Sequence, residues 1–156
     1  MRNPEISSQI QKLNILFDKA SSFSTVDLEA LSHWGKYLCV LSAGFIENGV
    51  KEIYSKFVSA SANPYITNYV NQSLSKLRNP KTGNILELTG SFNKVWRDSL
   101  EEYMNDEGRR EAIDSIMTNR HKIAHGKNSD ITIRRVNDYF KKAIQVIEYI
   151  ESNCLS

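Results

Sequence analysis

The sequence is poor in the residues that interrupt helices or link chain segments covalently. It contains only three prolines and seven glycines, so long uninterrupted helices are possible. It also contains only two cysteines, Cys39 and Cys154, which do not form a CxxC pair. This spacing argues against a structural zinc site and against a disulfide framework. Two reduced thiols instead fit a cytoplasmic protein.

Long apolar runs and a strong net charge are also missing. No stretch reaches the roughly 18 uncharged apolar residues that a membrane span requires, and the first residues lack the apolar core of a signal peptide. We therefore expect no membrane association. The formal charge of +2 does not by itself indicate a nucleic-acid binder. A length of 156 residues with 40% hydrophobic residues predicts one globular domain, residues 1–156.

Apolar residues recur at steps of three and four along the chain, and no convincing run alternates as a strand would. Ser24 or Thr25 is the expected N-cap of a long second helix with a nearly all-apolar middle. The pattern predicts an all-α bundle of five or six helices. The predicted helical stretches run approximately over residues 4–19, 26–57, 66–77, 85–103, 109–124 and 132–151.

Two of the three histidines, His121 and His125, lie four residues apart near the end of one predicted helix. This spacing could place two imidazoles on one metal ion. The metalloprotease pattern, however, requires a glutamate where this chain has Lys122, and no nearby acid supplies a third ligand. We therefore predict neither a metal nor another cofactor. His33 lies beside a tryptophan in the long helix, and we assign it no role.

Arg120 and His125 form a second pairing with different chemistry. Five residues correspond to about 140° on a helix, so the two side chains would flank a groove. A guanidinium can hold a phosphate oxygen through two hydrogen bonds, and an imidazole can transfer a proton near neutral pH. RNA carries its own nucleophile, the 2′-hydroxyl, so these groups could support cleavage without a metal. A two-fold dimer would double the set.

Basic residues outnumber acidic ones around this pair, which weakly indicates a surface that binds the phosphate backbone of a nucleic acid. Lys122 and Lys127 are the nearest candidates for contacts with RNA. The residues alone leave open a simpler interpretation, in which the cations only stabilise a solvated helix end. The basic residues of the region are Arg109, Arg110, Arg120, Lys122, Lys127, Arg134 and Arg135.

The stretch from Ile113 to Gly126, IDSIMTNRHKIAHG, resembles the signature of HEPN domains, which often contain an R-N-x-I-A-H-G string. Arg120 and His125 match the arginine and histidine of that signature, whereas His121 stands where asparagine is usual. The segment LSAGFIE, which ends at Glu47, is similar to the RiboL-PSP-type HEPN subgroup. The resemblance covers most of the chain from about residue 25 to 152.

The resemblance implies a HEPN-like helical bundle that forms a homodimer with the motifs at the interface. It also implies a metal-independent endoribonuclease that acts in a toxin–antitoxin pair, in phage defence or in RNA processing, with an antitoxin as a possible protein partner. Arg120 and His125 would be catalytic, His121 would support them, and Glu47 would orient the arginine. The alternatives are a non-catalytic HEPN domain that binds RNA or protein, and a purely structural dimerisation domain.

Overall fold

The computed structural model describes residues 1–23 and 27–155, which form seven α-helices and no strands. The predicted all-α class is therefore confirmed, but the predicted number of five or six helices is too low. The helices are α1 (Pro4–Ser21), α2 (Leu28–Ser61), α3 (Pro64–Leu74), α4 (Thr82–Phe92), α5 (Lys94–Met104), α6 (Arg109–Ala124) and α7 (Ile133–Leu155). None of these described helices is long and apolar enough to cross a membrane.

The additional helix arises because the apolar stretch predicted over residues 85–103 is divided at Asn93. The Asn93 side chain accepts hydrogen bonds from the backbone N–H groups of Val95 and Trp96, and so acts as the N-cap of α5. The same residue is the C-cap of α4, where its backbone is extended. Asparagine is among the preferred N-cap residues because its side-chain oxygen satisfies unpaired N–H groups. One apolar stretch therefore folds as two antiparallel helices.

The boundaries of α2 also differ from the prediction. Its described N-cap is Asp27, whose carboxylate accepts a hydrogen bond from the Ala30 N–H. The expected caps, Ser24 and Thr25, lie outside the described residues. At the other end α2 continues to Ser61, beyond the predicted end at residue 57, and the N–H of its C-cap, Ala62, donates to the Val58 carbonyl. Helix α3 then begins after its own N-cap, Asn63.

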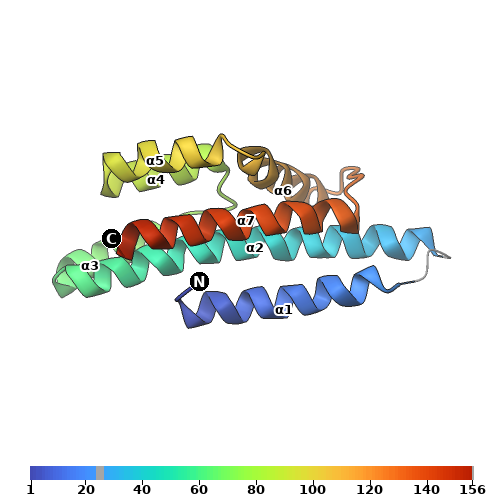
Figure 1. Cartoon of the computed structure of the whole chain (residues 1–156), viewed down its shortest axis with the longest axis horizontal. Coiled ribbons are helices and arrows are strands. Elements are labelled where there is room, and N and C mark those ends of the chain that lie inside the picture. The colour runs from blue at the N-terminus through green and yellow to red at the C-terminus, as the bar shows by residue number, and fades with distance from the viewer. Residues whose placement is uncertain (24–26, 156) are drawn as a thin grey trace.

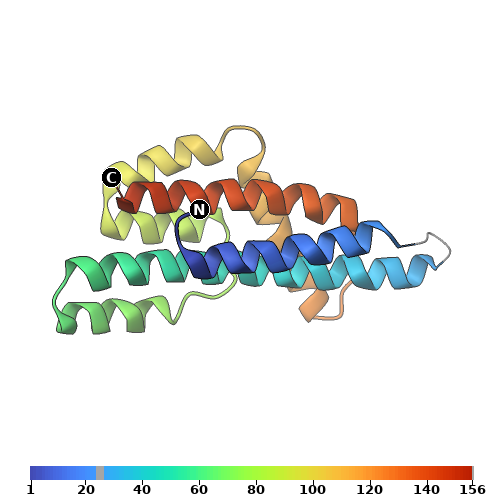
Figure 2. The ribbon, with the colours of Figure 1, turned by 60° about the horizontal axis from the view of Figure 1, so that its bottom comes forward.

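The long helix α2 packs against α1, α3, α6 and α7 and forms the centre of the bundle (Figure 1). Helix α7 lies alongside it, and the close approach is possible because Gly49 has no side chain where the Ile147 side chain packs. Stacked rings of Phe17 and Phe140, with centroids 5.2 Å apart, join α1 to α7. Turning the molecule shows α1, α2 and α7 running side by side along the long axis (Figure 2).

Helix α6 lies at an angle to this layer and packs on both α2 and α7. It begins after Gly108, whose φ of 70° lies in the left-handed region that favours glycine. Its buried side includes Ile113, Ile116 and Met117. The Sγ atom of Cys39 on α2 lies 3.5 Å from the Ile116 carbonyl oxygen, which marks the tight contact between the two helices. The last turn of α6 is left exposed to solvent.

Candidate functional site

The C-terminal end of α6 is fixed by its own backbone. The N–H of Lys127 donates to the carbonyl of Lys122 at 2.9 Å, and the N–H of Gly126 donates to that of Ile123 at 3.2 Å. This pair of bonds is the Schellman motif, which places a left-handed residue directly after the helix. Gly126 has a φ of 66° and fills that position. The predicted helix stop is therefore confirmed, and the C-cap residue is His125.

The four-residue spacing of His121 and His125 brings them together on one exposed side of the helix end. Their ring centroids are 4.3 Å apart and the ring planes are inclined by 52°. The charge of His125 is the main reason that the pKa of His121 lies below its ordinary value. Partial desolvation and the charges of Lys127, Lys81 and Arg120 lower it further. Such a pair favours keeping His121 neutral at a pH where an isolated histidine begins to be protonated.

Arg120 is half-buried on the last turn of α6, whereas Lys122 and Lys127 are exposed. Within the described part of the chain, no hydrogen bond or ion pair engages the Arg120 guanidinium. Its donors are therefore available to a ligand. Adjacent helix positions differ by about 100°, so Arg120 projects away from the histidine pair on its own helix. One copy of the chain therefore presents the arginine and the histidines on neighbouring sides of the helix end.

The loop that follows the motif is anchored to the bundle at two points. The Ser129 hydroxyl donates to the Asn119 side-chain oxygen at 2.8 Å, while the Asn119 amide donates to the Ser115 carbonyl on the preceding turn. Further along, the Ile131 carbonyl oxygen lies only 2.8 Å from where a Cβ on Gly35 would stand. The absence of a side chain at Gly35 therefore lets the loop lie against α2, and this contact supports the helix end.

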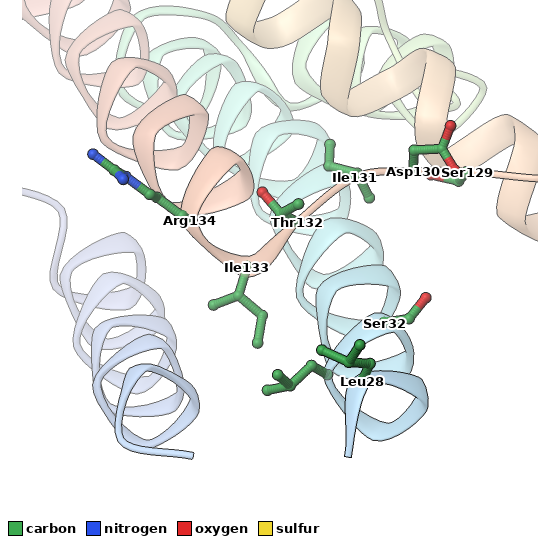
Figure 3. A pocket seen from close by; sticks show the side chains of 9 residues that line it. Leu28, Ser32, Ser129, Asp130, Ile131, Thr132, Ile133 and Arg134 are labelled. Atoms are coloured by element: carbon green, nitrogen blue, oxygen red, sulfur yellow. The ribbon is translucent and has the colours of Figure 1, made fainter. Parts of the chain in front are cut away.

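A pocket of about 470 Å³ lies beneath this loop, between the start of α2 and the start of α7 (Figure 3). Leu28 and Ser32 contribute to it from α2, and Ile133 contributes from α7. Arg120, His121 and His125 do not line it. The pocket therefore adjoins the anchored loop but is separate from the candidate site.

Glu47 lies in a different network from the one expected for it. Its carboxylate accepts hydrogen bonds from Lys51 at 2.8 Å and from the Asn79 N–H at 2.7 Å, and it lies 3.6 Å from Arg78. Partial burial tends to raise the pKa of Glu47. The two hydrogen bonds and the charges of Lys51 and Arg78 outweigh burial and leave this pKa below its ordinary value. The expected contact with Arg120 is not among the interactions of Glu47 in the described structure.

Lys81, which the sequence pattern did not single out, lies close enough for its charge to affect His121. It immediately precedes α4 and is exposed. Nothing in the local sequence relates position 81 to position 121, because the proximity depends on how α4 packs against α6.

The donor set of the site does not suit a metal ion. In residues 1–23 and 27–155, no group of three or more His, Cys, Asp and Glu side chains is placed to hold one. The charges that act at His121 come instead from cationic groups, which include Lys127, Lys81 and Arg120. A cationic surface with two adjacent imidazoles is better suited to an anionic ligand such as a phosphate ester.

Comparison with models of protein families gives a match to RiboL-PSP-HEPN over residues 4–155. This range extends from the start of α1 to the end of α7 and includes the whole motif region. No curated protein and no solved structure matches the chain.

Proposed function

Because this chain belongs to the RiboL-PSP-HEPN family, we propose that it is a metal-independent endoribonuclease of a toxin–antitoxin or phage-defence system. The family match supports an RNA-related function, and the exposed helix end supplies the groups that cleavage needs. The proposal rests mainly on one observation, the pair of imidazole rings 4.3 Å apart at the end of α6. Arg120 lies on the same helix turn, and no hydrogen bond or ion pair engages its guanidinium within the described residues.

In the proposed reaction, one imidazole of the pair accepts the proton of an RNA 2′-hydroxyl. The 2′-oxygen then forms a bond to the adjacent phosphorus, and the bond from phosphorus to the 5′-oxygen breaks. A protonated imidazole gives a proton to the departing 5′-oxygen, so the products are a 2′,3′-cyclic phosphate and a 5′-hydroxyl. Arg120 stabilises the negative charge that builds up on the phosphate oxygens. His125 is the principal proton-transfer residue, and neutral His121 supports it.

A homodimer would bring these groups together more completely than one copy does. On an ideal helix Arg120 and His125 would be about 140° apart, so in a single copy the two side chains start from different sides of the helix end. A two-fold axis near the helix ends places the arginine of one copy opposite the histidines of the other. We propose that the RNA binds in the cleft between the two helix ends, with Lys122 and Lys127 contacting its backbone. An antitoxin protein that covers this cleft would block cleavage.

The test is cleavage of a fluorescent RNA in the presence of EDTA by the parent chain and by Arg120→Ala, His121→Ala and His125→Ala. Loss of one proton-transfer group typically lowers the rate by about 10²–10⁴-fold. His33→Ala is the matched control, since His33 is an exposed histidine on α2 whose side chain is 68% accessible. Mass spectrometry should find the cyclic phosphate, and an RNA with a 2′-deoxy nucleotide at the cleaved position should remain intact. Cleavage at the parent rate by a folded, dimeric Arg120→Ala or His125→Ala variant would falsify the assignment.

The exposure of the histidine pair also suits a second function, RNA binding without cleavage. Both rings are open to solvent in one copy of the chain, and a non-catalytic HEPN domain would use the same cationic surface. Purified protein that retains RNA on a filter, yet leaves it uncut with and without divalent metals, would favour this alternative.

A further inference from the structure

The segment between α3 and α4 is held in place by two carboxylates from different helices. Glu47 on α2 accepts a hydrogen bond from the Asn79 N–H at 2.7 Å. Asp114 on α6 accepts from the Thr82 N–H at 2.9 Å and from the Thr82 hydroxyl at 3.0 Å. Lys81 lies between these two attachment points. Its backbone position is therefore determined from both sides, although its side chain is exposed.

The backbone of this segment is also strained. Asn79 has a φ of 41°, which is uncommon for a residue other than glycine although asparagine adopts it more readily than most residues, and it directly precedes Pro80, which restricts it further. Strained residues persist only when the surrounding structure holds them, and they concentrate at functional sites. Here the bond from the Asn79 N–H to Glu47 is the contact that holds the strained residue.

The attachment to Asp114 directs this segment toward the histidine pair. Asp114 and His121 are seven residues apart on α6, which is about two turns, so they lie on the same side of the helix. Lys81 is the residue next to Thr82, which Asp114 holds. The charge of Lys81 helps to lower the pKa of His121, together with the charges of His125, Lys127 and Arg120. The lysine therefore adds a cation from the N-cap position of α4 to the side of α6 that carries the imidazoles.

We propose that Lys81 is an RNA-binding residue of this site, and that its ammonium group contacts a backbone phosphate next to the one that is cleaved. This inference rests on the proposed function only in requiring that RNA binds at the end of α6. Glu47 then acts as a positioning residue, because it holds the turn that presents Lys81. If Lys81 served only to make the start of α4 hydrophilic, its backbone would not need to be fixed by a strained turn that is attached to two other helices.

Binding is measured with a short 2′-O-methyl oligonucleotide of mixed sequence, which lacks the nucleophile and is not cleaved. Loss of one phosphate contact to a single strand makes the slope of log K against log salt shallower by about 0.7. If the variant and the parent bind equally at 1 M salt, the variant therefore binds about fivefold more weakly at 0.1 M salt. We expect this change for Lys81→Gln and near-parent behaviour for Lys81→Arg. Lys76→Gln is the matched control, because Lys76 is exposed in the same connecting segment and is not among the charges that lower the pKa of His121. Equal salt slopes for Lys81→Gln and the parent would overturn the proposal.

A second measurement does not depend on cleavage. The C2 proton of His121 is titrated by NMR in the parent, in Lys81→Gln and in Lys76→Gln. We expect the His121 midpoint to rise only in Lys81→Gln, because a nearby positive charge has been removed. Suppose that the salt slope and the His121 midpoint change as expected in Lys81→Gln, but that neither the parent nor any variant cuts RNA. Lys81 is then an RNA contact, and the cleavage proposal fails. If the parent cuts RNA while the His121 midpoint and the salt slope are unchanged in Lys81→Gln, cleavage stands and Lys81 has no part in it.

Discussion

Replacing Gly126 by alanine tests whether the end of α6 positions the site. Gly126 has a φ of 66°, and a Cβ built on it meets no other atom within 4 Å. The substitution therefore adds no steric clash, and its effect comes from the left-handed backbone alone. A side chain in that conformation costs about 1–2 kcal/mol. Alanine also reduces the conformational entropy of the unfolded chain, which stabilises the folded state by about 0.4–1 kcal/mol and offsets part of this cost. We expect Gly126→Ala to lower the free energy of unfolding by about 1 kcal/mol.

Gly44→Ala is the matched control for this experiment. A Cβ on Gly44 also meets nothing within 4 Å, but Gly44 lies within α2 with an ordinary helical φ. Alanine in a helix interior is favoured over glycine by about 0.5–1 kcal/mol, so this variant should be more stable than the parent. Urea unfolding followed by circular dichroism measures both. A Gly126→Ala variant as stable as the parent would refute the reasoning.

The same pair of variants separates stability from activity. His125 is the residue directly before Gly126, and a shift in the Schellman motif moves its imidazole relative to His121. Displacement of a reacting group by about 1 Å can lower a rate by about 100-fold. We expect cleavage by Gly126→Ala to fall by about tenfold or more at a temperature where it is fully folded. Gly44→Ala should cleave at the parent rate.

Three further predictions follow from the contacts of the site and its supports. His125→Ala should raise the pKa of His121 toward its ordinary value of 6.5, because the largest cause of its lowering is removed, and NMR titration measures the change. The pKa of Glu47 is lowered in the folded chain, so its contribution to stability is present above the unfolded pKa and is lost as the pH falls through the folded pKa. Urea midpoints between neutral and acid pH should therefore fall less steeply for Glu47→Gln than for the parent, and parallel curves would contradict this. Gly35→Ala places a Cβ 2.8 Å from the Ile131 carbonyl oxygen and should destabilise the chain by about 1–3 kcal/mol, whereas an unchanged urea midpoint would show that the loop is not held there.

Features that depend on local sequence were predicted well. The bounds predicted for α6, residues 109–124, agree with the structure because Gly108 and Gly126 mark both ends with left-handed backbone. The adjacency of His121 and His125 also follows from their spacing of four residues, since such positions are neighbours on a helix. The family resemblance was then confirmed by a match over residues 4–155.

Features that depend on packing were predicted less well. The division at Asn93 was missed because apolar residues continue on both sides of it, although an asparagine N-cap was a usable signal. The sequence suggested that the carboxylate of Glu47 orients Arg120. It could not show that Glu47 instead holds the turn at Asn79, 32 residues further along the chain. Lys81 was missed for the same reason, because its relation to His121 exists only after α4 packs against α6. The roles of Arg120, His121, His125, Lys122 and Lys127 remain predictions that the experiments above address.

The shared helix of the two imidazoles limits how such a site can be regulated. His121 and His125 occupy one helical turn that is closed by its own backbone bonds, so sliding of one helix past another leaves their mutual distance unchanged. Lys81 is the N-cap residue of α4, so a shear of α4 against α6 would change the distance from Lys81 to the pair. A regulator that shifts the packing of the bundle would therefore alter the retention of the substrate and leave the proton-transfer groups intact.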